Sequence, residues 1–207
     1  MSRQKSEQHG AQRKLILDNA AEAFAELGFP GASMLHLAAL CGVSKSLLYH
    51  YYTSKEQLLF DLLEEYMQRL VALTERAAPK SPRARFEALI HSFMQEYETS
   101  RHRHRVLLND LKYLSARERN KIIGYERQVV AAFAAVIGDV LDLPPTASLI
   151  KPLTMALFGM MNWTFTWLKP DKGLSYQQFA ELLLALFSAG SKHAVKRARG
   201  MKMVSMA

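Results

Sequence analysis

Cysteine, glycine and proline are scarce in this sequence. Of 207 residues, 1 is Cys (Cys41), 10 are Gly and 7 are Pro, while 49% are hydrophobic. A lone cysteine cannot form an internal disulfide, and this composition excludes a disordered, collagen-like or low-complexity chain. The first residues, MSRQKSEQHGAQRK, lack the apolar stretch of an export signal, so we expect a cytoplasmic protein.

Long uncharged segments are also rare. Residues 152–168 carry no formal charge over 17 residues, close to the roughly 20 residues that a helix needs to cross a bilayer. The segment begins at Pro152, contains Asn162 and several Thr, and has charged flanks. We therefore expect a buried helix in a protein interface and no membrane contact.

Acidic residues are absent from one region of a basic chain. The formal net charge is +8, from 27 Lys and Arg against 19 Asp and Glu, yet no acid lies between Glu26 and Glu56. A surface without acids suits the phosphates of nucleic acid, because Lys and Arg contacts release condensed counterions. Charge alone leaves open the alternative that basic residues only solvate the surface. The basic residues and histidines of this region are His36, Lys45, His50 and Lys55.

Apolar residues recur at spacings of three and four along most of the chain, which is typical of amphipathic helices. No segment shows the alternation of a half-buried strand. Gly28 is expected to stop the first helix, and S-x-x-Q capping boxes begin helices at Ser54 and Ser175. The sequence predicts an all-α fold of about nine helices. They are expected at residues 13–27, 33–40, 45–52, 54–77, 85–98, 106–114, 117–140, 149–168 and 176–189.

The spacing of four residues predicts a helix-turn-helix. Ala38 is small enough for two helices to cross closely, and Gly42 can supply the positive φ that ends the first helix. Val43 and Leu48 then face inward and hold the second helix in place. An ordinary corner between two helices would use similar residues, so the spacing alone leaves both interpretations open.

Lys45 and Lys55 each lie in the first turn of an expected helix, where a positive side chain opposes the helix dipole. The stability of each helix alone would therefore favour an acidic residue at these positions. A phosphate docked beside these residues would account for their position. The alternative is that exposed lysines are tolerated there at a small cost.

Together these residues resemble the DNA-binding domain of the TetR (tetracycline repressor) family of bacterial transcriptional regulators. The resemblance rests on Ile16-x3-Ala20-Ala21-x2-Phe24-x3-Gly28-Phe29 and on residues 37–59, LAALCGVSKSLLYHYYTSKEQLL. It implies an all-helical homodimer with a three-helix, helix-turn-helix DNA-binding domain (residues 1–57) and a larger helical effector-binding and dimerisation domain (58–207). The implied partners are double-stranded operator DNA, a second copy of the chain and a small effector.

The resemblance also implies which residues meet DNA. Leu48 and Tyr52 fall on the core side of the recognition helix. Ala32, Leu35 and His36 depart from the family pattern, and we expect Leu35 to pack against a neighbour. The implied DNA-binding residues are Ser44, Lys45, Ser46, Leu47, Tyr49, His50, Tyr51 and Lys55.

A second, weaker resemblance concerns the C-terminal half. Residues 106–112 (VLLNDLK) and Phe158-Gly159-x2-Asn162-Trp163-x3-Trp167-x2-Pro170-Asp171 are similar to a branch whose members often sense acyl-CoA thioesters. An apolar or acyl-CoA effector needs an apolar tunnel and cations for its phosphates. Ordinary core packing and a solvated arginine run are the alternatives. The implied ligand-binding residues are Phe93, Met94, Tyr97, Arg101, Arg105, Leu108, Leu111, Phe133, Phe158, Met161, Asn162 and Phe165.

The last two long helices are more apolar than a monomer can cover, which predicts a four-helix dimer interface. We expect no metal, because His102 and His104, as an i,i+2 pair, point to different sides of a helix. We expect no cofactor and no catalysis, because no nucleophile with a base and no Gly-rich phosphate loop is visible. The rival hypothesis is an all-α lipid- or acyl-CoA-binding protein, or an enzyme, without specific DNA binding. The predicted interface residues are Leu153, Leu157, Met160, Leu182, Leu183, Leu186 and Phe187.

Overall fold

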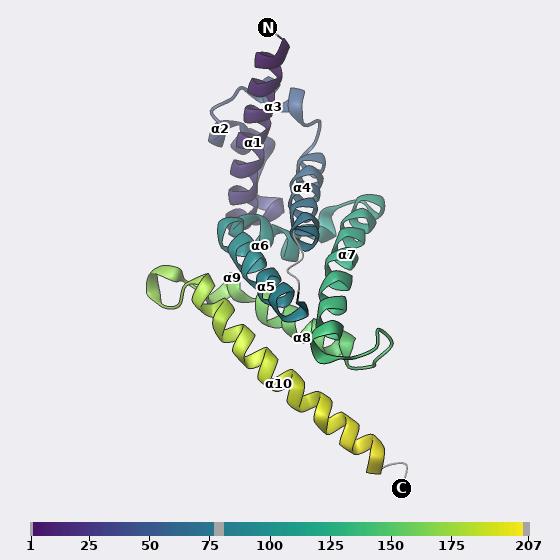
Figure 1. The fold of residues 1–207 in the computed structure, drawn as a ribbon. Helices are drawn as coiled ribbons and strands as arrows, with labels where there is room; N and C mark the ends of the chain where they lie inside the picture. The colour runs from purple at the N-terminus through teal and green to yellow at the C-terminus, as the bar shows by residue number, and fades with distance from the viewer. Residues whose placement is uncertain (1, 77–80, 205–207) are drawn as a thin grey trace. The chain divides into compact units, whose positions relative to one another are not determined.

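The computed structural model describes residues 2–76 and 81–204 (Figure 1). Over these ranges the chain forms ten α-helices and two single-turn 3-10 helices, and no strand. The all-α prediction is confirmed, and so is the count of about nine, since α9 has four residues. The elements are α1 (Ser2–Gly31), α2 (Met34–Leu40), α3 (Lys45–Tyr51), α4 (Lys55–Glu75), α5 (Pro82–Thr99), α6 (Arg101–Asp110), η1 (Leu111–Tyr113), α7 (Ala116–Leu141), α8 (Ile150–Asn162), α9 (Thr164–Trp167), η2 (Pro170–Lys172) and α10 (Tyr176–Val204).

The chain divides into two compact units. The first unit contains residues 1–69 and 100–125, and the second contains residues 70–99 and 126–207. The first unit therefore combines α1, α2, α3 and most of α4 with α6 and the beginning of α7. The division at residue 57 into a DNA-binding and an effector-binding part stays a prediction about function.

Helix α1 is longer than the apolar pattern predicts, because it begins at Ser2 and not at Arg13. Residues 2–12 are mostly polar residues that tolerate a helix, so the helix extends beyond its buried stripe. The predicted stop at Gly28 is confirmed by a break in helical geometry there, with φ +72°. The core side of α1 contributes Ile16, Leu17 and Phe24, all fully buried.

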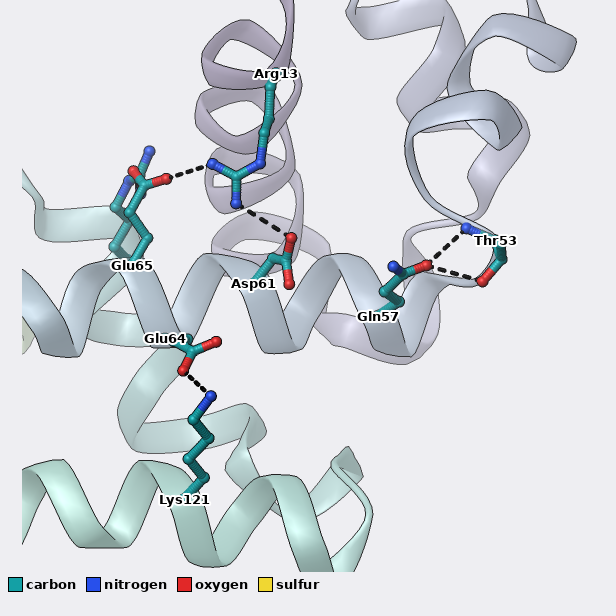
Figure 2. A network of polar contacts seen from close by, with 8 residues as sticks. Arg13, Thr53, Gln57, Asp61, Glu64, Glu65 and Lys121 are labelled. Carbon is teal, nitrogen blue, oxygen red and sulfur yellow. Dashed lines mark hydrogen bonds and ion pairs between the residues drawn. The ribbon is translucent and has the colours of Figure 1, made fainter. Parts of the chain in front are cut away.

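Capping at Ser54 and Ser175 follows the prediction. The Ser54 Oγ accepts the backbone N–H of Gln57 at 3.1 Å, although the Gln57 side chain turns to Thr53 (Figure 2). The Ser175 cap is reciprocal, because its Oγ accepts from the Gln178 N–H and its own N–H donates to the Gln178 Oε1. Both α4 and α10 thus start where the sequence places them.

A buried arginine joins three helices of the first unit. Arg103 of α6 is only 4% exposed. Its Nη2 lies 2.6 Å from Asp18 Oδ1 on α1, and its Nη1 lies 3.0 Å from Glu65 Oε1 on α4. Glu65 also accepts from Arg13 of α1, which in turn reaches Asp61 at 3.1 Å (Figure 2). The ion pairs therefore run from α6 through α4 to α1.

The second unit is built on α5 and α10, which lie against each other. On α5, His91 Nδ1 is 2.8 Å from Gln177 Oε1 of α10 and its Nε2 is 3.0 Å from Glu181 Oε1. Deeper in the unit, the ring of Phe133 packs edge to face against Phe93. The His91 contacts hold the first turns of α10 against α5.

Three helix boundaries differ from the prediction. The segment expected as one helix over 149–168 is interrupted at Trp163 and forms α8 and α9. Helix α6 begins at Arg101, earlier than the expected 106, because its first turn carries the buried Arg103. Helix α10 continues to Val204, past the expected end at 189. Across the described ranges, none of the helices is both long enough and apolar enough for a bilayer.

Replacing Arg103 with Met should lower the free energy of unfolding of the chain by about 3 kcal/mol, because Asp18 and Glu65 would lose a desolvated partner. Urea unfolding followed by circular dichroism measures the change. The control is Arg101→Met on the same helix, where the side chain is exposed and the expected change is about 0.5 kcal/mol or less. Equal effects of the two substitutions would contradict the assignment.

Candidate nucleic-acid interface

The corner between α2 and α3 has the geometry that its sequence predicts. Gly42 has φ +63°. Its N–H donates to Ala39 O at 3.1 Å, and the Val43 N–H donates to Ala38 O at 3.0 Å. This pair of bonds is a Schellman motif, which satisfies the last carbonyls of α2 and turns the chain sharply toward α3.

Ser44 begins α3 as its N-cap. The Ser44 Oγ accepts the backbone N–H of Leu47 at 3.1 Å and lies 3.0 Å from the Ser46 Oγ. Leu48 and Tyr52 are fully buried, as their assignment to the core side predicts. Burial raises the pKa of the Tyr52 phenol to about 12, so this anchor stays neutral at physiological pH. These contacts fix the rotation of a helix of only 7 residues.

The rest of α3 up to His50 is exposed apart from Leu48. Lys45, Ser46 and His50 face solvent, and the Tyr49 side chain is 41% exposed. The Lys45 Nζ lies 5.8 Å from the centroid of the Tyr49 ring, on the same face one turn away. Leu47 is exposed as well. Because residues 27–55 contain no Asp or Glu, no acid of α2 or α3 offsets this positive charge.

Two predicted DNA-binding residues also have partners within the chain. Tyr51 is half-buried and stacks on His9 of α1, with ring centroids 4.7 Å apart. The Lys55 Nζ donates to the backbone O of Phe29 at 2.6 Å and lies 4.3 Å from that ring's centroid. Lys55 therefore ties the start of α4 to the end of α1, a role that the sequence did not reveal. Its binding to a phosphate stays a prediction.

The expectation that Leu35 packs against a neighbour is wrong. The Leu35 side chain is 65% exposed, whereas Met34, Leu37 and Ala38 of the same helix are buried. In a helix of 7 residues, these three already fill the side that faces the core. His36 is exposed too, so α2 presents an apolar and an imidazole side chain to solvent.

The predicted effector-binding residues are divided between the two compact units. In the second unit, Asn162 accepts a 2.9 Å hydrogen bond from the Tyr97 hydroxyl, and burial raises the pKa of that phenol. In the first unit, Arg101, Arg105 and Leu108 are exposed. A shared pocket stays a prediction. The remaining members are buried at Phe93, Met94, Phe133, Phe158 and Met161, and half-buried at Leu111 and Phe165.

The structure divides the predicted dimer-interface residues by burial, and their part in a dimer stays a prediction. Leu157, Leu183 and Phe187 are buried within their own chain. Helices α8 and α10 are apolar on more than one side, and these three residues lie on the inner side. The predicted residues Met160, Leu182 and Leu186 are exposed, and Leu153 is half-buried. Large exposed apolar residues that the prediction missed are Met155, Trp163, Trp167 and Leu174.

In the comparison with known proteins, family models match both the N-terminal and the C-terminal part of the chain. Residues 16–62 match the family model described as bacterial regulatory proteins, tetR family, and residues 79–191 match the tetracyclin repressor-like C-terminal domain. A TetR-family transcriptional regulator from Bordetella parapertussis 12822 superposes with a TM-score of 0.80 and 34% identity, covering 84% of this chain and 93% of that one.

Two further relatives are informative. The transcriptional repressor KstR2 of Mycolicibacterium smegmatis is 26% identical over 204 residues, which cover 90% of this chain and 97% of the repressor. AibR, whose structure contains isovaleryl coenzyme A and operator DNA, shares the fold, with a TM-score of 0.72, 23% identity and coverage of 84% and 97%. Other curated relatives are matched over only 34% to 54% of their length.

Replacing Gly42 with Ala should lower the free energy of unfolding by about 1–2 kcal/mol, because an L side chain is strained at positive φ. No atom lies within 4 Å of the added Cβ, so the loss reports backbone conformation alone. Thermal or urea unfolding measures it.

Gly124 provides a matched control inside α7, where a Cβ also meets open space. Gly124→Ala should raise stability by up to about 1 kcal/mol, since alanine favours a helix. If both substitutions act in the same direction, the left-handed turn at Gly42 is not what shapes the corner.

Proposed function

The chain belongs to the TetR family of bacterial regulatory proteins, and from this membership we propose that it is a transcriptional repressor, not an enzyme, that acts in the cytoplasm on operator DNA. The observation that carries the proposal is the two-sided arrangement of α3. Leu48 and Tyr52 hold one side in the core, while Lys45, Tyr49 and His50 are exposed. A helix presented in this way fits the major groove, which is about 12 Å wide.

Each exposed residue of α3 suits a different part of the DNA. Lys45 suits a phosphate, which positions the helix without reading sequence. The Tyr49 hydroxyl and the His50 imidazole suit hydrogen bonding to base edges, and Leu47 suits the methyl group of thymine. The Ser44 and Ser46 hydroxyls lie within hydrogen-bond distance of each other at the start of the helix, with their Oγ atoms 3.0 Å apart. Their hydroxyls suit further contacts to the sugar-phosphate backbone.

A dimer is supported by the apolar surface of the second unit. Met160 and Leu186 are exposed on α8 and α10, and Trp163, which follows α8, is 64% exposed. Large exposed apolar residues gathered on neighbouring helices mark an interaction surface. A two-fold dimer through this surface predicts a palindromic operator whose half-sites lie about 34–36 Å apart.

The proposed effector is a small apolar molecule or an acyl-CoA. Buried aromatic rings at Phe93, Phe133 and Phe158 lie within the second unit, and Arg101 and Arg105 are exposed cations. The fold is shared with AibR, which was solved with isovaleryl coenzyme A. We infer that an effector of this kind shifts the balance between DNA-bound and released populations, which requires about 5.5 kcal/mol of differential affinity.

The ion pairs of the first unit supply a route for the response. Arg103 fixes α6 to α1 and α4, and Arg13 continues the chain of charges to Asp61. A shift of α6 would either break these ion pairs or move α1 and α4 with it. Effector binding that displaces α6 would therefore move α1 and α4, which flank α3, and change operator affinity.

Operator binding tests the role of α3. Tyr49→Ala should weaken binding about tenfold by loss of a base contact, and Lys45→Ala should lower the slope of log K against log salt by about 1. Lys172→Ala, at an exposed position of η2, is the charge-matched control and should bind like the wild type. Gel-shift titrations over a salt series measure both quantities.

Normal operator binding by both α3 variants would contradict the proposal. Weak and non-specific DNA retention by the wild type would instead favour the rival function, an all-α lipid- or acyl-CoA-binding protein. Lys55→Ala is not used in this test, because it also removes the hydrogen bond to Phe29 O.

Thermal stability in the presence of coenzyme A thioesters tests the effector. An acyl-CoA at a hundred times its dissociation constant should stabilise the native protein by about 2.7 kcal/mol, which differential scanning fluorimetry detects as a raised Tm. Free coenzyme A and free fatty acid are the controls. The absence of any shift across short, long and branched thioesters would remove the acyl-CoA proposal and leave the operator proposal intact.

A further inference from the structure

Helix α1 extends beyond the part of the chain that matches the DNA-binding family model. That match begins at residue 16, whereas α1 begins at Ser2. Figure 1 shows α3 beside the N-terminal turns of α1. The contact is explicit at His9, whose ring lies 4.7 Å from that of Tyr51, with an angle of 29° between the planes. The start of α1 is therefore attached to the recognition helix.

The stack also separates two sides of α3. Tyr51 is half-buried, and its ring stacks on that of His9 and lies nearly perpendicular to that of His50. At about 100° per residue, Tyr51 lies at one flank of α3 and Tyr49 with Lys45 at the other, with the exposed His50 between them. When a helix enters the major groove, its exposed face meets base edges and its flanks meet the sugar-phosphate walls. His9 lies at such a flank.

The chemistry of His9 fits a phosphate. Stacking occupies the face of the imidazole, and its N–H groups point from the ring edge, so the ring remains able to donate a hydrogen bond. The His9 side chain is exposed. Residues 8–17 contain no Asp or Glu, and Lys14 on the same stretch is exposed. No acid within this stretch would repel an anion.

We propose that His9 is a further DNA-contacting residue, whose imidazole N–H donates to a backbone phosphate at the wall of the groove that α3 occupies. The inference rests on the proposed operator binding by α3. It assigns the N-terminal turns of α1 to the DNA interface, outside the helix-turn-helix itself. The stack on Tyr51 holds the imidazole in place before DNA arrives, so less side-chain freedom is lost on binding.

Two substitutions separate the hydrogen bond from the stack. His9→Phe keeps an aromatic ring against Tyr51 but has no N–H, and His9→Ala removes both. Both variants should bind the operator duplex about tenfold more weakly than the wild type, with unchanged circular dichroism. Wild-type affinity of H9F would overturn the proposal, because the ring would then act only by positioning Tyr51.

A second duplex of scrambled sequence distinguishes a phosphate contact from a base contact. Phosphate contacts carry no sequence information, so H9F should lose a similar factor on the operator and on the scrambled duplex. A loss confined to the operator would overturn the phosphate assignment.

The Y49A variant, measured in the same titrations, keeps this inference separate from the proposed function. If Y49A loses operator affinity and H9F does not, only the His9 proposal fails. If neither variant loses affinity, the operator-binding role of α3 fails with it.

Discussion

The buried guanidinium of Arg103 is the interaction on which the first unit depends. Removing an arginine from water is costly unless its charge is paired, and here Asp18 of α1 and Glu65 of α4 provide the carboxylates. Glu65 is shared with Arg13, so two cations and three carboxylates form one chain of contacts. Because α6 is held in this way, residues 100–125 belong to the same compact unit as the helix-turn-helix. A movement of α6 would therefore be transmitted to α1 and α4, the helices next to α3.

Helix α3 has 7 residues, too few to be stable as an isolated helix in water. Its stability comes from its ends and from one side: the Ser44 cap, the turn at Gly42, and the buried Leu48 and Tyr52. None of these contacts uses the exposed face. The side chains on that face make none of these stabilising contacts, so their identity is open to selection for DNA recognition.

Local features of the fold could be predicted from the sequence, whereas which face of a helix is buried could not. Gly42 and Ser54 act through atoms a few residues away, so their roles are visible in the sequence. Arg101, Arg103 and Arg105 alternate with histidines, and only the tertiary structure determines that the middle one is buried. The hydrogen bond from Lys55 Nζ to Phe29 O joins residues 26 positions apart, so the spacing of apolar residues gives no sign of it. The same limit explains why the sequence did not separate the buried Leu183 from the exposed Trp163.

The two units present surfaces of opposite chemistry, and the proposed function needs both. The face of α3 carries lysine and polar side chains without acids, which suits a polyanion but gives one helix only a few base contacts. The exposed apolar residues of α8 and α10, such as Met155 and Leu186, suit association with a second copy. In the proposed dimer, two copies of α3 would be linked, so the second half-site would bind at a high effective concentration. Specificity for a palindrome would then come from the geometry of the dimer together with the side chains of α3. An effector that altered that geometry would lower operator affinity without touching any residue that contacts DNA.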